Sequence, residues 1–140
     1  MSKIVLSEIK EPSDTTLDPK LRSLLDDQLP EPTENFIYCA TCSHVITTLA
    51  EKTSVHGQHE HFCVNPHGFE FHVGCFSNAL GCDITGPSYA ADSWFMGFAW
   101  KLATCAQCQT HLGWYFSATN DGVAPDFFYG LILSKIQEEL

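Results

Sequence analysis

Two Cys-x-x-Cys motifs constrain this 140-residue chain more than any other feature of its sequence. They are Cys39-x-x-Cys42 and Cys105-x-x-Cys108, and 62 residues separate them. Each motif presents two thiolates to one side of a tetrahedral metal, and four thiolates leave no position for water, as in structural zinc sites. The sequence therefore predicts one structural Zn²⁺, held by Cys39, Cys42, Cys105 and Cys108, whose binding energy contributes directly to folding.

Other cysteine and histidine patterns compete with this interpretation. One Cys-x-x-Cys motif is also typical of a thioredoxin-like redox pair, but two of them in a β-rich chain without a βαβ pattern favour metal binding. His111 follows Cys108 by three residues, and His59 and His61 share a strand face. Both patterns are also typical of structural histidines. The other thiols have no partner spacing and are interpreted as small core hydrophobes: Cys63, Cys75 and Cys82.

The composition of the chain changes near residue 36. Residues 1–35 hold four of the seven prolines and eight acidic against four basic residues, with no aromatic residue, glycine or cysteine. This composition predicts an acidic, disordered N-terminal arm. Within the arm, residues 19–29 place four leucines at helical spacing and indicate a short helix. The rest of the chain is predicted to form one domain over residues 36–136.

Short segments rich in aromatic and β-branched residues fill this domain and predict β-strands. They are FIYC, HVITTL, EHFCV, FEFHV, HLGWYFS and FFYGLILSKI. Turn-forming residues separate them, for example at 65–68, 86–88 and 120–122, which favours antiparallel meanders over crossover helices. We therefore predict an all-β fold.

Charge and composition argue against several classes of partner. Seven Lys and Arg against 17 Asp and Glu give a formal net charge of −10, which repels a phosphate backbone, so no nucleic-acid partner is expected. No apolar run approaches membrane-spanning length, and the first residues lack a secretory signal, so no membrane partner is expected. The lack of such a signal predicts a reducing intracellular compartment, cytoplasmic or nuclear, in which closely spaced thiols more often hold metal than form disulfides.

All three tryptophans of the chain lie within residues 93–116. Trp114 and Phe116 are two positions apart and are expected on one face of a strand, while Gly97 lets the backbone bend between Trp94 and Trp100. Spacing alone leaves two interpretations open. The rings either fill the core of a small domain or form an aromatic box for a ligand.

Four motifs, in this order and spacing, resemble the CULT domain family, the thalidomide-binding domain of cereblon. They are Cys39-x-x-Cys42, Val64-Asn65-Pro66-His67-Gly68, Ser93-Trp94-Phe95-x-Gly97-x-Ala99-Trp100 and Cys105-x-x-Cys108-x-x-His111-x-Gly113-Trp114-x-Phe116. The resemblance covers about residues 36–134. It implies a β-tent, in which two antiparallel sheets lean together beneath a structural zinc.

The resemblance implies a binding module without catalytic activity. Its ligand would be a cyclic imide or a uracil-like ring, such as a thalidomide-type glutarimide or the C-terminal cyclic imide of a damaged or cleaved protein. The implied cage consists of Trp94, Trp100, Trp114 and Phe116, with polar contacts from the backbone around Asp92, Ser93 and Trp94 and with Asn65 at the rim. Because an unmatched buried polar group costs ~1 to 3 kcal/mol, such a cage must supply both a donor and an acceptor to an imide.

Two alternative functions stay open. Three tryptophans beside Asp92 are also typical of an aromatic cage for methylammonium groups. Methionine sulfoxide reductases share the implied fold and its paired Cys-x-x-Cys motifs, but no cysteine follows Cys108 and the others lack an activating motif, so no enzyme activity is expected. Cereblon docks onto a ubiquitin-ligase adaptor through a Lon-like domain, and no counterpart precedes Phe36, so adaptor binding is not expected.

Overall fold

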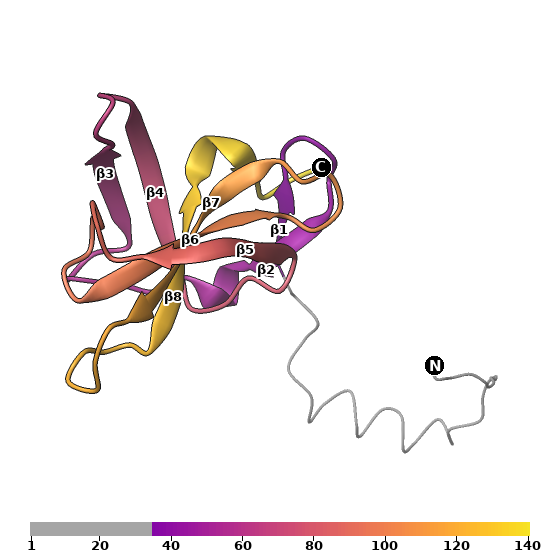
Figure 1. Ribbon diagram of the computed structural model, residues 1–140. Helices are drawn as coiled ribbons and strands as arrows, with labels where there is room; N and C mark the ends of the chain where they lie inside the picture. The colour runs from indigo at the N-terminus through magenta and orange to yellow at the C-terminus, as the bar shows by residue number, and fades with distance from the viewer. Residues whose placement is uncertain (1–34) are drawn as a thin grey trace, which may run out of the picture. The chain divides into compact units, whose positions relative to one another are not determined.

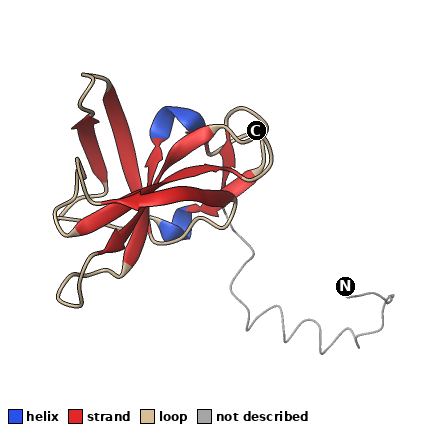
Figure 2. Cartoon of the chain, viewed as in Figure 1, coloured by secondary structure: helices blue, strands red, loops and turns tan. Residues whose placement is uncertain are grey.

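This computed structural model describes residues 35–140, which form nine β-strands and two short 3-10 helices joined by loops (Figures 1 and 2). The predicted acidic arm and its helix at 19–29 lie outside the described residues, apart from Asn35. The strands are β1 (Phe36–Cys39), β2 (Val45–Thr48), β3 (Glu60–Val64), β4 (Glu70–Phe76), β5 (Cys82–Tyr89), β6 (Phe98–Cys105), β7 (His111–Ala118), β8 (Phe127–Ile132) and β9 (Ile136–Gln137). The helices are η1 (Leu49–Glu51) and η2 (Leu133–Lys135), and neither has the length to cross a membrane.

The strands form two antiparallel sheets, which confirms the predicted fold class. The small sheet has the order β2-β1-β9, and the large sheet has the order β3-β4-β8-β7-β6-β5. The hairpin of β3 and β4 projects from one end of the large sheet (Figure 1). Residues from opposite ends of the described chain meet in the small sheet, because β9 pairs with β1.

Two clusters of buried side chains form the core. The first lies where the small sheet meets the large one and includes Ile37, Ile46, Phe76 and Leu131. The second is largely aromatic, and in it Phe95, Phe98, Phe116 and Phe128 pack with ring centroids about 5 Å apart. Cys42 and Cys108 pack against the first cluster, whereas Trp94 and Trp100 pack against the second. The two candidate sites are therefore supported by different parts of the core.

The structure corrects the predicted turn at 86–88. These residues belong to β5, which pairs with β6 on both sides of an irregularity between Thr85 and Tyr89. Gly86 has φ of 82°, a backbone conformation that glycine adopts without strain and that is typical of a bulge. A Gly-Pro pair is tolerated here because β5 is an edge strand with almost all of its residues exposed.

Candidate functional site

The four cysteines of the two Cys-x-x-Cys motifs come together in one cluster. Their sulfur atoms all lie within 4.8 Å of one another, with Cys39 Sγ 3.7 Å from Cys108 Sγ and Cys42 Sγ 3.6 Å from Cys105 Sγ. Cys39 and Cys105 are buried, while Cys42 and Cys108 are partly exposed. The cluster joins the end of β1 to the end of β6 and offers a set of four sulfur ligands to a metal ion.

The two motifs have the same backbone turn. In the first motif, the amide of Cys39 donates to the His44 carbonyl and the amide of Ser43 donates to the Cys39 carbonyl. In the second motif, the amide of Cys105 likewise donates to the Thr110 carbonyl and the amide of Gln109 donates to the Cys105 carbonyl. Ser43 and Gln109 occupy equivalent positions, with φ of 67° and 66°. This turn brings both thiols of each motif to one side of the backbone.

The thiols of Cys42 and Cys108 lie in different electrostatic surroundings. Burial raises the pKa of Cys42 to about 12. Hydrogen bonds from the Thr110 side chain and backbone lower the pKa of Cys108 to about 6, and the Thr110 Oγ1 lies 3.0 Å from the Cys108 Sγ. Four thiolates repel one another, so full ionisation of the cluster needs a cation among them.

The remaining histidines and thiols of the sequence analysis lie outside this cluster. The Nε2 of His111 donates to the Gly113 carbonyl at 2.9 Å, and its ring lies edge-on to Trp114. His59 and His61 donate to the backbone of residues 53–58. Cys63 and Cys75 are buried in the core as expected, whereas Cys82 is only partly buried and lies opposite Cys105 on the neighbouring strand.

The three tryptophans line one hollow of about 290 Å³. Trp100 and Leu102 on β6 lie opposite Phe116 and Trp114 on β7, so four side chains cover one face of the sheet. Trp94 comes from the loop before β6, and the tip of the β3–β4 hairpin closes another side. The lining residues are Asn65, Pro66, His67, Asp92, Trp94, Trp100, Leu102, Trp114 and Phe116.

The walls of the hollow are held in place from outside. Trp94 and Trp114 form a corner, with ring centroids 4.6 Å apart and an interplanar angle of 78°. The indole Nε1 of Trp94 donates to the Val64 carbonyl at 3.0 Å, and that of Trp100 donates to the Ala91 carbonyl at 2.9 Å. Tyr89 packs on Trp100 with ring centroids 4.7 Å apart. The hollow is therefore a preformed aromatic cage.

Polar groups at the cage stay open to a ligand. The Oδ1 of Asn65 accepts hydrogen bonds from the amides of His67 and Phe69 at 3.0 and 2.9 Å, and its NH₂ group makes no hydrogen bond within residues 35–140. Within residues 35–140, neither the Asp92 carbonyl nor the Trp94 amide is paired with another backbone group. Three residues that line the cage thus carry polar groups without a backbone hydrogen-bond partner among residues 35–140.

One predicted contact does not line the hollow, and several lining residues were not predicted. The Ser93 hydroxyl bonds to the backbone of Phe95, and Ser93 borders an adjacent hollow instead. Pro66, His67 and Leu102 line the cage but were not among the predicted contacts. Alternation along a strand would have placed Leu102 beside Trp100, but β6 was not among the predicted strands.

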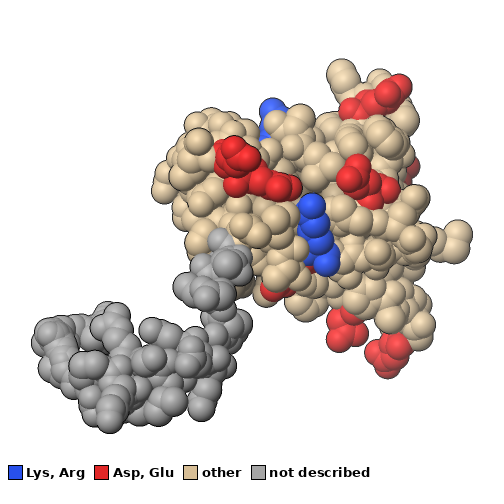
Figure 3. Space-filling model, turned by 180° about the vertical axis from the view of Figure 1, so that it is seen from behind, with Lys and Arg blue, Asp and Glu red and all other residues tan. Residues whose placement is uncertain are grey.

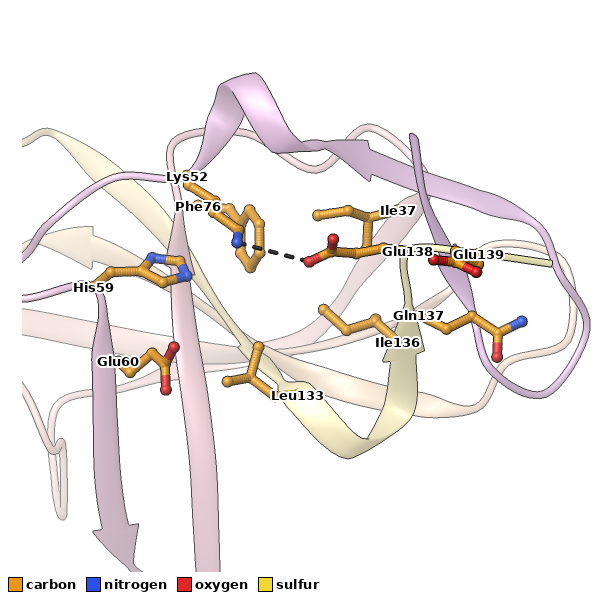
Figure 4. Close-up of a pocket in the computed structure, with 10 residues that line it drawn as sticks. All are labelled: Ile37, Lys52, His59, Glu60, Phe76, Leu133, Ile136, Gln137, Glu138 and Glu139. Atoms are coloured by element: carbon orange, nitrogen blue, oxygen red, sulfur yellow. Dashed lines mark ion pairs between the residues drawn. The ribbon is translucent and has the colours of Figure 1, made fainter. Parts of the chain in front are cut away.

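A second hollow, of about 500 Å³, lies between β4, η2 and β9 (Figure 4). Its floor is apolar, with Ile37, Phe76 and Ile136, and an ion pair of 3.7 Å between Lys52 and Glu138 lies at its edge. It contains none of the predicted site residues. The larger hollow is thus an amphipathic surface depression, and the smaller, tryptophan-lined cage is the candidate ligand site.

Comparisons with known proteins agree with the motifs. No family model matches the chain. Cereblon of Xenopus tropicalis is 36% identical over 77 residues, which are 55% of this chain and 17% of that protein. Cereblon of Gallus gallus is 37% identical over 73 residues (52% and 16%), and that of Drosophila pseudoobscura pseudoobscura is 31% identical over 110 residues (74% and 17%).

The chain spans only about a sixth of the length of these relatives. The matched region nevertheless combines the expected two antiparallel sheets, the four-cysteine cluster and the aromatic clusters. Sequence similarity and structure agree on this region: the chain carries a cereblon-like CULT domain, homologous to one part of cereblon.

Proposed function

We propose that the tryptophan cage binds a planar cyclic imide, such as a glutarimide or the C-terminal cyclic imide of a peptide. One observation carries this proposal: the indole N–H groups of Trp94 and Trp100 are already bonded to backbone carbonyls, while the cage rim keeps other polar groups free. The walls therefore present apolar ring faces to a ligand. The polar edges of an imide would find their partners at the rim.

The polar groups of the residues that line the cage include the types of hydrogen-bond donor and acceptor that an imide needs. An imide has one N–H between two carbonyls, so it needs one acceptor and two donors. Among residues 35–140, the Asp92 carbonyl is an acceptor without a hydrogen-bond partner, and the Trp94 amide and the Asn65 NH₂ group are donors without one. The hollow of about 290 Å³ is just below the usual range for ligand pockets, about 300 to 1,000 Å³, which favours a single small ring.

We further propose that the four-cysteine cluster holds one structural zinc. Four sulfurs at about 2.3 Å from a tetrahedral zinc lie about 3.8 Å from one another. The sulfur separations of 3.7 Å between Cys39 and Cys108 and of 3.6 Å between Cys42 and Cys105 are close to this value. Bound Zn²⁺ would offset two of the four negative charges of the thiolates and connect β1 to β6. A reducing intracellular compartment, where thiols stay free, belongs to the same proposal.

A binding role without catalysis is supported by the state of the other thiols. A nucleophilic cysteine needs an accessible thiolate. Cys63 and Cys75 are buried, burial raises the pKa of both, and that of Cys75 reaches about 12. Cys82 lies opposite Cys105 of the cysteine cluster and does not line the cage. These features argue against a sulfoxide reductase mechanism at the cage.

Calorimetric titration of glutarimide into the wild-type protein and the Trp100→Ala variant tests the imide proposal. We expect micromolar binding to the wild type, about −8 kcal/mol, and no binding to the variant. Phe62→Ala is the matched control, because Phe62 is an exposed aromatic residue outside the cage. Thermal unfolding of each variant checks that it is folded.

Parallel titrations separate the alternatives. Binding of trimethyl-lysine but not of glutarimide would replace the imide with a methylammonium ligand, which Asp92 beside three tryptophans would also suit. Thiol-dependent reduction of a methionine sulfoxide substrate would restore the enzyme alternative. Equal heats of glutarimide binding in wild type and Trp100→Ala would reject the cage as the binding site.

A further inference from the structure

Asp92 is the only residue with a formal charge among the nine that line the cage, with histidine counted as neutral. It also lines the adjacent hollow formed by the loop of residues 90–98, so Asp92 lies at the boundary between the two hollows. Asp92 is exposed and forms no ion pair within residues 35–140. Among residues 35–140, no ion pair therefore offsets the negative charge of Asp92 beside the cage.

The lysines of the described residues do not line this cage. Lys101 lies between Trp100 and Leu102 on β6 and therefore points to the opposite face of the sheet. Lys52 borders the second hollow and pairs with Glu138, and Lys135 belongs to η2. Elsewhere, acidic side chains are spread among uncharged ones, as the face in Figure 3 shows. No positive charge of residues 35–140 lines the cage to offset Asp92.

We propose that Asp92 selects imide ligands by the charge of the group attached to the ring. A positively charged substituent strengthens binding, and a negatively charged one weakens it. This inference rests on the proposed imide binding. The ring fills the cage and its substituent leaves through the mouth, where it lies within range of the Asp92 carboxylate. A peptide with basic residues next to a terminal cyclic imide would thus be preferred over an acidic one.

The size of the effect follows from the exposure of Asp92. Contacts between exposed charges contribute about 0.2 to 1 kcal/mol, which corresponds to about 1.4-fold to 5-fold in affinity. Salt screens such contacts, because the Debye length falls from about 30 Å at 0.01 M to about 3 Å at 1 M. We therefore expect a modest preference, strongest at low ionic strength.

Three N-acyl derivatives of 3-aminoglutarimide test the proposal, since they differ only at the end of the substituent. They carry a butyryl, a β-alanyl or a succinyl group, which are neutral, cationic and anionic at neutral pH. By calorimetry in low salt, we expect the β-alanyl derivative to bind about 3-fold more tightly than the butyryl one and the succinyl derivative about 3-fold less tightly. Both differences should disappear at about 1 M salt.

Two variants locate the effect. Asp92→Asn removes the charge and keeps the backbone, because φ of 59° at this position suits asparagine. It should abolish the ranking of the three ligands. Asp83→Asn makes the same change of net charge on β5, away from the cage, and should preserve the ranking.

The outcomes separate the two proposals. If none of the three ligands binds, the imide proposal fails and this inference with it. If all three bind with equal affinity in low salt, or if the ranking persists in Asp92→Asn, selection by Asp92 is wrong while imide binding stands. The salt dependence in the wild type tests the inference even if Asp92→Asn binds poorly.

Discussion

The cysteine cluster and the tryptophan cage are both assembled from separate segments of the chain, but they differ in whether their polar groups are paired within the site. Both join segments that are distant in sequence, and β6 contributes to both. In the cysteine cluster the four sulfur atoms face one another, and the metal they would hold completes the fold. In the cage, hydrogen bonds to backbone carbonyls fix two of the tryptophans, and within residues 35–140 the Asp92 carbonyl and the Trp94 amide have no backbone partner. We therefore propose that the closed cysteine cluster supports the fold and that the open tryptophan cage binds a ligand.

The largest effect should come from removing a metal ligand. We expect Cys105→Ala, or treatment with a strong chelator, to unfold the domain, because structural zinc contributes on the order of 10 kcal/mol and a domain of this size has about 5 to 15 kcal/mol of stability. Thermal unfolding followed by circular dichroism measures this. Cys63→Ala is the matched control, a buried thiol outside the cluster, and should cost only about 1 kcal/mol. Equal losses in the two variants would remove the special role of the cluster.

A glycine on β7 separates the second cysteine motif from the cage. A Cβ at Gly113 would lie 2.0 Å from the Gly130 carbonyl oxygen on β8, so Gly113→Ala should force the strands apart and cost about 3 kcal/mol. Gly122→Ala is the control, because its nearest contact would be an ordinary 3.4 Å. Denaturant unfolding compares the two variants. An unchanged midpoint for Gly113→Ala would contradict the close packing of β7 on β8.

The open rim predicts a loss of binding without loss of stability. Asn65→Asp keeps an oxygen that accepts from the His67 and Phe69 amides but removes the free NH₂ group, so we expect glutarimide affinity to fall about 10-fold, or about 1.4 kcal/mol. Asn120→Asp makes the same change in a turn where Asn120 accepts from the Gly122 amide, away from the cage, and should leave affinity unchanged. Calorimetry and thermal unfolding together measure both variants. A destabilised Asn65→Asp would show that this side chain serves the hairpin instead of a ligand.

The smallest effect concerns His111, which lies between the two sites. Burial lowers its pKa below that of an exposed histidine. The unfolded chain then binds the proton more readily, so the stabilising contribution is present above about pH 6.5 and is lost as the pH falls below it. Unfolding between pH 8 and pH 6 should therefore depend less on pH in His111→Gln than in the wild type. Identical pH dependence would mean that His111 titrates alike in both states.

Sequence patterns predicted what is local and missed what depends on neighbours. The cysteine cluster was predictable because the geometry of each Cys-x-x-Cys turn is encoded within a few residues. Trp114 and Phe116 were placed on one strand face by alternation, and the structure agrees. The sequence did not reveal that residues 86–88 belong to a strand, because their place in β5 depends on its exposed edge and on its bulge. The free state of the Asn65 NH₂ group likewise depends on a turn that only the folded hairpin shows.

The central claim is that the cage is preformed and open at its polar rim. Its most direct test is the NMR spectrum of protein labelled with ¹⁵N at tryptophan, recorded during titration with glutarimide and assigned through Trp→Phe variants. We expect the backbone amide of Trp94 to shift most, because it gains a hydrogen bond, while the indole N–H signals of Trp94 and Trp100 keep their positions as already bonded groups. A spectrum in which no tryptophan signal moves at millimolar ligand would contradict the claim.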